Sequence, residues 1–211
     1  MSGAPRWVGL LALVILALIT LNTILTKPNG ATGLAAGASL PPFAVPLVTG
    51  NLQGAANVAR HAEEGQKGKR PACEVRGPRI LNVCELNERG PLVLALFVYV
   101  GGCERILGDM QTLRRAFPGV RFAAVSIKGD RGELRKLVFR DRLSFPVGID
   151  EEGTLAALYK LASCPQVTLV YPGGVVQSHA LLVRPPLAEL RARIAALVAG
   201  ARARGWRGPV S

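Results

Sequence analysis

The feature that most constrains the fold is an uninterrupted apolar run over residues 91–100, PLVLALFVYV. Its length suits a β-strand, and a strand that is apolar on both faces is typical of the centre of a covered sheet. Gly101 and Gly102 then interrupt the run. Over residues 103–117 apolar side chains recur every three or four positions, which predicts a helix with one buried stripe: Ile106, Leu107, Met110 and Leu113.

Strands and helices continue to alternate after this unit. We expect strands over residues 121–127, 145–149, 166–171 and 175–183, and helices over 132–143, 154–161 and 186–203. Either Thr154 or Asp150 is expected to cap the helix that begins at residue 154. A helical crossover makes the first strands parallel, and a turn at Gly173 and Gly174 makes the last pair antiparallel. The predicted fold class is therefore α/β, a central mixed sheet flanked by helices.

Residues 7–26 contain no charged side chain. A helix of this length spans about 30 Å, the thickness of a hydrocarbon core. The pattern predicts a single-pass transmembrane anchor over residues 1–27, with the cell membrane as a partner. A cleaved signal peptide and a buried core helix are the alternatives, although the nearest A-x-A pattern, at 36–38, lies well past the apolar stretch.

The remaining organisation follows from composition. Residues 28–71 are rich in Gly, Ala and Pro and indicate a linker, of which the more apolar piece 40–50 is expected to dock on the domain. The domain itself is predicted over residues 72–203, followed by a basic tail over 204–211.

The chain is basic, since 26 Lys and Arg against 14 Asp and Glu give a net charge of +12. The basic residues are spread along the sequence and aromatic residues make up only 5% of it. Spread charge without stacking residues favours a solvated basic surface over a nucleic-acid site. It also allows attraction to anionic lipid headgroups. We expect no cofactor. We also expect no metal site, because His61 and His179 show no metal-ligand spacing.

Cys73 and Cys84 lie on either side of Gly77-Pro78, in a stretch whose alternating pattern suggests a hairpin. In a hairpin the two thiols would face each other and form a structural disulfide; two unpaired, partly buried thiols are the alternative. The cysteines favour an oxidising compartment, so the domain is expected outside the cytoplasm.

Residues 81–176 resemble the thioredoxin-like redoxins, in particular the membrane-anchored TlpA type and the AhpC/TSA group. The resemblance is carried by LNVCEL followed by GPLVLALF, by Cys103 at a strand-to-helix junction, and by GIDEEGTLAALYKLASCPQVTLVYPGGVV. It implies a thioredoxin-like fold and either thiol–disulfide exchange or thiol-dependent antioxidant chemistry. Protein thiols, protein disulfides or a peroxide would be the partners.

The sequence departs from that family at three places. The second cysteine of the family's C-x-x-C is replaced by Ile106. The P-x-x-x-T-x-x-C of peroxidase members is absent, since Leu96 and Val100 occupy its Pro and Thr positions. Phe97 stands near the place of the buried acid of thioredoxins.

The resemblance implies a role for each remaining cysteine. Cys103, at a helix N-terminus that favours the thiolate, would attack, and Cys164 would be the resolving thiol, bonded to Cys103 in the oxidised protein. Pro165 would be the family's cis-proline. Substrate binding is assigned to Gly101, Gly102, Arg105 and Ser163. The alternative is a redox-inactive thioredoxin-like module that binds or assembles partners at a membrane surface.

Overall fold

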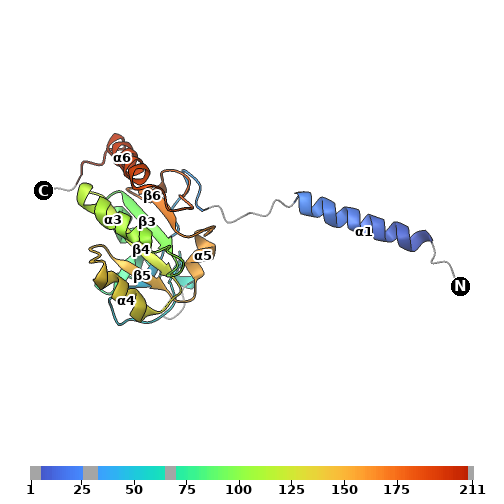
Figure 1. The fold of residues 1–211 in the computed structure, drawn as a ribbon, viewed down its shortest axis with the longest axis horizontal. Coiled ribbons are helices and arrows are strands. Elements are labelled where there is room, and N and C mark those ends of the chain that lie inside the picture. The colour runs from blue at the N-terminus through green and yellow to red at the C-terminus, as the bar shows by residue number, and fades with distance from the viewer. Residues whose placement is uncertain (1–5, 26–32, 65–69, 209–211) are drawn as a thin grey trace. The chain divides into compact units, whose positions relative to one another are not determined.

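The computed structural model describes residues 6–25, 33–64 and 70–208 of the 211-residue chain. The chain divides into one unit within residues 1–30 and a second within 31–211. In the first unit the described residues form helix α1 (Arg6–Leu25), shown in blue in Figure 1. Among the described residues, no helix combines the length and the apolar character needed to cross a membrane. The transmembrane helix expected over residues 1–27 is therefore not supported; its first five residues and its last two lie outside the described ranges.

The second unit is built on a five-stranded sheet with the order β5-β4-β3-β6-β7. Its strands are β3 (Leu92–Phe97), β4 (Arg121–Ile127), β5 (Val147–Asp150), β6 (Gln166–Tyr171) and β7 (Val175–Val176). Strands β3, β4 and β5 are parallel, whereas β6 runs antiparallel to β3 and β7 antiparallel to β6. The predicted parallel crossover, final antiparallel pair and mixed sheet are confirmed.

Strand β3 lies at the centre of this sheet, and none of its side chains is exposed to solvent. Leu92, Leu94 and Leu96 face one apolar cluster. The alternate residues, from Val93 to Phe97, face the other cluster. The run is apolar on both faces because both faces of the sheet are covered, as the sequence predicts.

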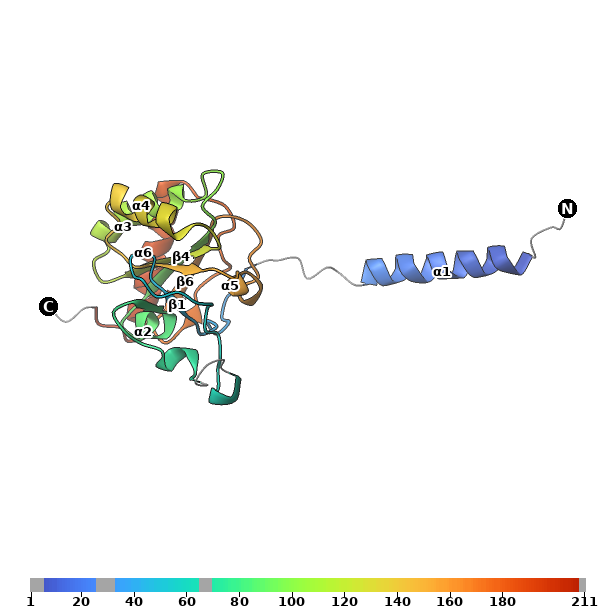
Figure 2. The same ribbon diagram turned by 90° about the horizontal axis from the view of Figure 1, so that it is seen from below.

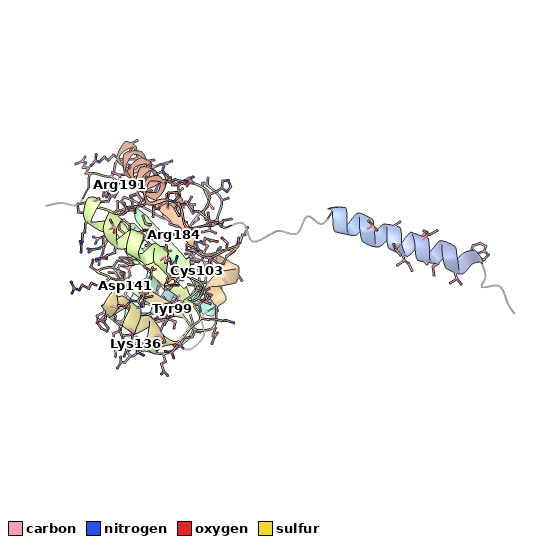
Figure 3. The ribbon with its side chains drawn as sticks, viewed as in Figure 1. Tyr99, Cys103, Lys136, Asp141, Arg184 and Arg191 are labelled. Atoms are coloured by element: carbon pink, nitrogen blue, oxygen red, sulfur yellow. A yellow bond between two sulfur atoms is a disulfide. The ribbon has the colours of Figure 1, made fainter. Side chains whose placement is uncertain are left out.

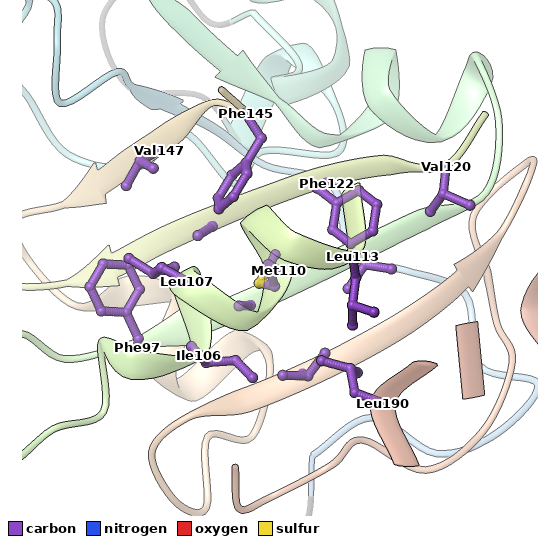
Figure 4. Close-up of a cluster of buried hydrophobic side chains, with 14 of the residues drawn as sticks. Phe97, Ile106, Leu107, Met110, Leu113, Val120, Phe122, Phe145, Val147 and Leu190 are labelled. Carbon is purple, nitrogen blue, oxygen red and sulfur yellow. The ribbon is translucent and has the colours of Figure 1, made fainter. Parts of the chain in front are cut away.

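Three helices cover one face: α3 (Arg105–Ala116), α4 (Arg131–Arg140) and α6 (Leu187–Ala203). All four residues of the predicted stripe on α3 are buried there, and Figure 4 shows them within the cluster. The other face is covered by α2 (Val83–Glu88), by α5 (Thr154–Leu158) and by the segment of chain that precedes α2. Figure 2 shows α3 and α4 on one side of the sheet and α2 and β1 on the other.

Residues 33–64 pack on the domain and do not form a free linker. Strand β1 (Ala44–Pro46) pairs antiparallel with β2 (Ile80–Asn82), and Phe43, Val45 and Val48 are fully buried. The expected docking of residues 40–50 is confirmed. The linker expected over 28–71 is wrong for most of its described length, because Phe43 and Val45 pack in the apolar cluster on the α2 and α5 face and Val48 packs in the cluster on the α3 face. Residues 28–32 and 65–69 lie outside the described ranges.

The hairpin expected around Gly77 is also wrong. The stretch forms a 3-10 turn, η2 (Ala72–Glu74), then β2 and α2, and β2 pairs with β1 instead of with its own neighbour. A second 3-10 turn, η1 (Ala62–Glu64), precedes it. Towards the C-terminus, β7 is shorter than the strand expected over 175–183, although Leu181 still forms an isolated bridge with Val167.

Asp150 is the residue that caps α5. Its carboxylate oxygens accept hydrogen bonds from the backbone N–H groups of Gly153, at 3.1 Å, and Leu155, at 2.7 Å. Of the two capping residues allowed by the sequence, only Asp150 precedes the helix far enough to turn its side chain back onto the first free N–H groups.

Candidate active site

The candidate site lies where β3 ends and α3 begins. Residues 98–104 connect the two elements, and the connection closes through hydrogen bonds from the N–H of Cys103 to the carbonyl of Val100 and from the N–H of Arg105 to the carbonyl of Gly102. Gly101 and Gly102 have φ values of 67° and 85°, a region that favours glycine. Residues 103 and 104, which the sequence pattern assigned to the helix, belong to this turn, so α3 begins at Arg105 and not at Cys103.

Cys103 is bonded to Cys164 in a disulfide whose Cα atoms are 5.5 Å apart and whose residues are 61 positions apart in sequence. Cys164 lies in the loop that leads into β6, and the Cys164–Pro165 peptide bond is cis, as the resemblance implies. The sheet order explains the meeting: β6 lies beside β3, so the start of β6 and the end of β3 share one edge of the sheet.

The two sulfurs have different surroundings. Cys164 is partly buried and packs against the apolar cluster beneath α3, and the backbone N–H of Val98 donates to its sulfur at 3.1 Å. Cys103 is partly buried in the connection ahead of α3, and Figure 3 marks its position at that end of the helix. When the disulfide opens, the hydrogen bond from the Val98 N–H favours negative charge on the sulfur of Cys164 over that of Cys103.

The four residues assigned to substrate binding lie on the same two loops. Gly101 is exposed and Gly102 partly buried, and the side chain of Arg105 turns back over Gly102: a Cβ at Gly102 would lie 3.1 Å from Arg105 Nε. The exposed Arg105 side chain thus lies against the loop that carries Cys103. Ser163 precedes Cys164, and its hydroxyl is buried without a hydrogen-bond partner among the described atoms.

The loop before Pro165 is held by one buried side chain. Gln166 Nε2 donates to the carbonyl of Tyr159 at 2.9 Å, and Gln166 Oε1 accepts from the N–H of Ala162 at 3.4 Å. These two bonds connect the end of α5 with the start of β6. They fix the position from which Cys164 reaches Cys103.

Three features of the site were not predicted from the sequence. The Val98 N–H is a backbone group that only the tertiary fold brings to Cys164. Glu104 follows Cys103 directly and has a buried carboxylate oxygen, Oε2, without a partner among the described atoms; its place next to the cysteine was the available signal. Arg184 donates two hydrogen bonds to Asp109 on α3, at 2.7 and 3.0 Å, and no sequence spacing relates these residues.

Cys73 and Cys84 form a second disulfide, with Cα atoms 5.4 Å apart, on the opposite face of the sheet. The bond arises without the expected hairpin. Asn82 holds the two ends together: its Oδ1 accepts from the N–H groups of Cys84 and Glu85, and its Nδ2 donates to the carbonyls of Ala72 and Val75. This side chain also caps α2.

No protein-family model matches this chain, and no curated protein matches it. Solved structures do resemble it. A secreted Mycobacterium tuberculosis disulfide oxidoreductase homologous to E. coli DsbE is 20% identical, with a TM-score of 0.50 over 56% of this chain and 89% of that one. A protein of Chlorobium tepidum, proposed to be a thiol:disulfide interchange protein DsbE, is 16% identical, with a TM-score of 0.57 over 80% and 98%.

The peroxidoxin BcpB of M. tuberculosis is also similar, at 16% identity and a TM-score of 0.54 over 81% of this chain and 97% of that one. At these identities the likeness shows the fold: a thioredoxin-like α/β fold with a mixed central sheet flanked by helices.

Proposed function

We propose that this protein is a thiol–disulfide oxidoreductase in which Cys103 and Cys164 form the redox pair, with the second thiol placed on the cis-proline loop instead of one helical turn after the first. The observation that carries the proposal is the disulfide between these residues at the end of β3. A C-x-x-C pair would occupy Cys103 and position 106, but Ile106 is fully buried in the core.

In the oxidising direction a substrate thiolate attacks the sulfur of Cys103. A new bond forms between substrate and Cys103, the Cys103–Cys164 bond breaks, and its electron pair stays on Cys164, where the Val98 N–H stabilises it until solvent supplies a proton. A second substrate thiolate then attacks the substrate sulfur of the mixed disulfide. The substrate leaves as a disulfide, and both cysteines are left reduced.

In the reducing direction the same steps run backwards. The Cys103 thiolate attacks a substrate disulfide, one substrate thiolate leaves, and Cys164 then attacks Cys103 to release the second substrate thiol. The guanidinium of Arg105 is folded over Gly102, the residue before Cys103, and so adds positive charge to the loop that carries the attacking sulfur. Positive charge there favours the thiolate, which is the reactive form.

Exchange with thiols and disulfides is a better match to the site than peroxide reduction. A peroxide needs polar groups beside the attacking sulfur, and the positions that carry Pro and Thr in peroxidase members hold Leu96 and Val100. In the proposed function Gly101, where a Cβ would meet nothing within 4 Å, leaves room for a substrate backbone, while Gly102 lies under the Arg105 side chain and Ser163 and Pro165 belong to the neighbouring loop. The proposal places the site outside the cytoplasm, because disulfides persist in oxidising compartments.

The test compares reduction of insulin disulfides and consumption of hydrogen peroxide, each with dithiothreitol as electron donor, by the full chain, by Cys103→Ser and by a Cys73→Ser/Cys84→Ser control. We expect the wild type and the control to reduce insulin and Cys103→Ser to be inactive, with little peroxide consumed by any of them. Equal inactivity of wild type and Cys103→Ser in both assays would overturn the proposal and leave a redox-inactive binding module.

A further inference from the structure

A second candidate site lies at the opposite end of the sheet from the Cys103–Cys164 pair. It is a cavity of about 260 Å³ between the C-terminal end of α3, the start of β4 and residues 144–146. Arg121 there pairs with Leu92 at the start of β3, whereas the cysteine pair lies beyond the end of β3. Figure 4 shows the two ends of the core beneath them, with Phe97 and Ile106 at one end and Val120 and Phe122 at the other. The cavity is therefore separate from the redox site.

Three arginines line this cavity: Arg114, Arg115 and Arg121. None of the described residues that line it is acidic, and none of the ion pairs among the described residues involves these arginines. Compensation of the helix dipole accounts for basic residues in the last turn of α3. It does not account for Arg121, which lies on a strand on the other side of the cavity.

One of the arginines is held in place by neutral partners. Arg114 Nη1 donates to the hydroxyl of Ser144 at 2.9 Å, and Ser144 is tied to α3 by Gln111, whose Oε1 accepts from the Ser144 N–H at 3.0 Å. Gln111 Nε2 also donates to Ser144 Oγ, at 3.1 Å. These bonds fix the guanidinium at the rim without neutralising it and leave its other N–H groups for a ligand. A preorganised donor loses little entropy on binding.

Below the rim the lining is apolar and includes Val120, Phe122 and Phe145. An apolar floor with a ring of guanidinium groups fits a small molecule that has an apolar body and a compact anionic head. Guanidinium forks match phosphate and carboxylate oxygens in pairs, and three positive charges suit a doubly charged head better than a singly charged one. We infer that this cavity binds a phosphate monoester group, carried either by a small apolar molecule or by an anionic lipid headgroup.

The inference is tested by calorimetric titration of the full chain with phenyl phosphate and with inorganic phosphate. Arg114→Gln and Arg121→Gln remove charge at the cavity, and Arg191→Gln is the matched control. Arg191 lies on α6 (Figure 3), outside the cavity lining, and its substitution changes the net charge equally. We expect each cavity variant to weaken phenyl phosphate binding about tenfold, the effect of one charge-assisted hydrogen bond, and the control to bind like the wild type.

Sedimentation with vesicles separates the two sources of the phosphate. Binding to phosphatidic acid vesicles that depends on Arg114 and Arg121, without measurable phenyl phosphate binding, assigns the group to a lipid headgroup; the converse assigns it to a small molecule. The inference fails if the wild type binds neither probe at low ionic strength. It also fails if Arg191→Gln weakens binding as much as the cavity variants, because the attraction would then come from net charge alone.

Discussion

The backbone N–H of Val98 donates a hydrogen bond of 3.1 Å to the sulfur of Cys164, a residue 66 positions later in the chain. The bond makes the candidate redox pair asymmetric, because it stabilises charge on one sulfur and has no counterpart at the other among the described residues. A disulfide that opens beside such a donor leaves its electron pair on the sulfur that accepts the hydrogen bond. Four predictions follow for this pair and for the structure that holds it.

The first concerns which sulfur an external thiol attacks. When oxidised protein meets a small excess of glutathione and is quenched with N-ethylmaleimide, we expect glutathione on Cys103 and maleimide on Cys164, in a ratio of about ten to one or more. Peptide mapping by mass spectrometry measures this ratio, and Cys164→Ser supplies the reference spectrum for a stable adduct on Cys103. A ratio near one, or an excess on Cys164, contradicts the assignment of Cys164 as the leaving sulfur.

The second concerns the two glycines before Cys103. Both have positive φ, so Gly101→Ala and Gly102→Ala should each lower the free energy of unfolding by about 1 kcal/mol. Only at Gly102 would the added methyl group displace the Arg105 guanidinium, since a Cβ at Gly101 meets nothing within 4 Å. We therefore expect only Gly102→Ala to slow the attack of reduced Cys103 on oxidised glutathione, the step in which positive charge favours the thiolate, and Arg105→Gln to slow it similarly. Urea unfolding and stopped-flow kinetics give the two readouts; equal rates for both alanine variants would exclude the role of Arg105.

The third concerns Tyr159, whose hydroxyl donates to the carbonyl of Pro41 at 2.7 Å and whose ring packs edge-on against Phe43. Burial raises the pKa of Tyr159 well above its usual value, because the phenolate would lose its hydration. The unfolded chain releases this proton near pH 10 while the folded chain keeps it. The stability that depends on this group is thus complete below about pH 10 and is lost as the pH rises further.

Tyr159→Phe should therefore cost about 1 to 2 kcal/mol at pH 7, since it leaves the Pro41 carbonyl without its donor. Above pH 10 the difference from wild type should shrink, by up to about 1.4 kcal/mol per pH unit. Denaturant unfolding at pH 7, 10 and 11 measures this. The two proteins differ only at residue 159, so the comparison isolates this hydroxyl. A difference that stays constant up to pH 11 would argue against a buried, neutral phenol.

The fourth separates the two disulfides. Cys73 and Cys84 are 11 positions apart and hold the layer of chain that covers the second face of the sheet. Loop-closure entropy predicts that Cys73→Ala/Cys84→Ala loses about 3 kcal/mol of unfolding free energy. Because this bond lies on the other face, the rate of glutathione attack at Cys103 should be unchanged below the unfolding transition. Unfolding in urea tests the first statement, and a change in that rate would show that the two disulfides are coupled.

Local patterns in the sequence were sufficient for most of the framework. The predicted bounds of β4 and β6 are those of the structure, and β3 lies within its predicted run, because side-chain periodicity reports directly which faces are buried. The same periodicity was misleading around Gly77. An alternating run indicates an extended chain but does not identify its partner, and β2 pairs with β1 from a segment that was predicted to be a linker. The resemblance supplied the meeting of Cys103 with Cys164, which no local pattern contains.

The sequence alone thus determined the α/β class, the central strand and the residues of the apolar stripe on α3, since each depends on neighbours a few positions apart. Three features were decided only by the tertiary structure. They are the segment that packs on the second face of the sheet, the residue at which α3 begins, and the group that donates a hydrogen bond to the sulfur of Cys164. Those features depend on contacts between residues as far apart as Val98 and Cys164, or Tyr159 and Pro41. Such contacts arise from packing of the whole domain, and packing leaves no period in the sequence.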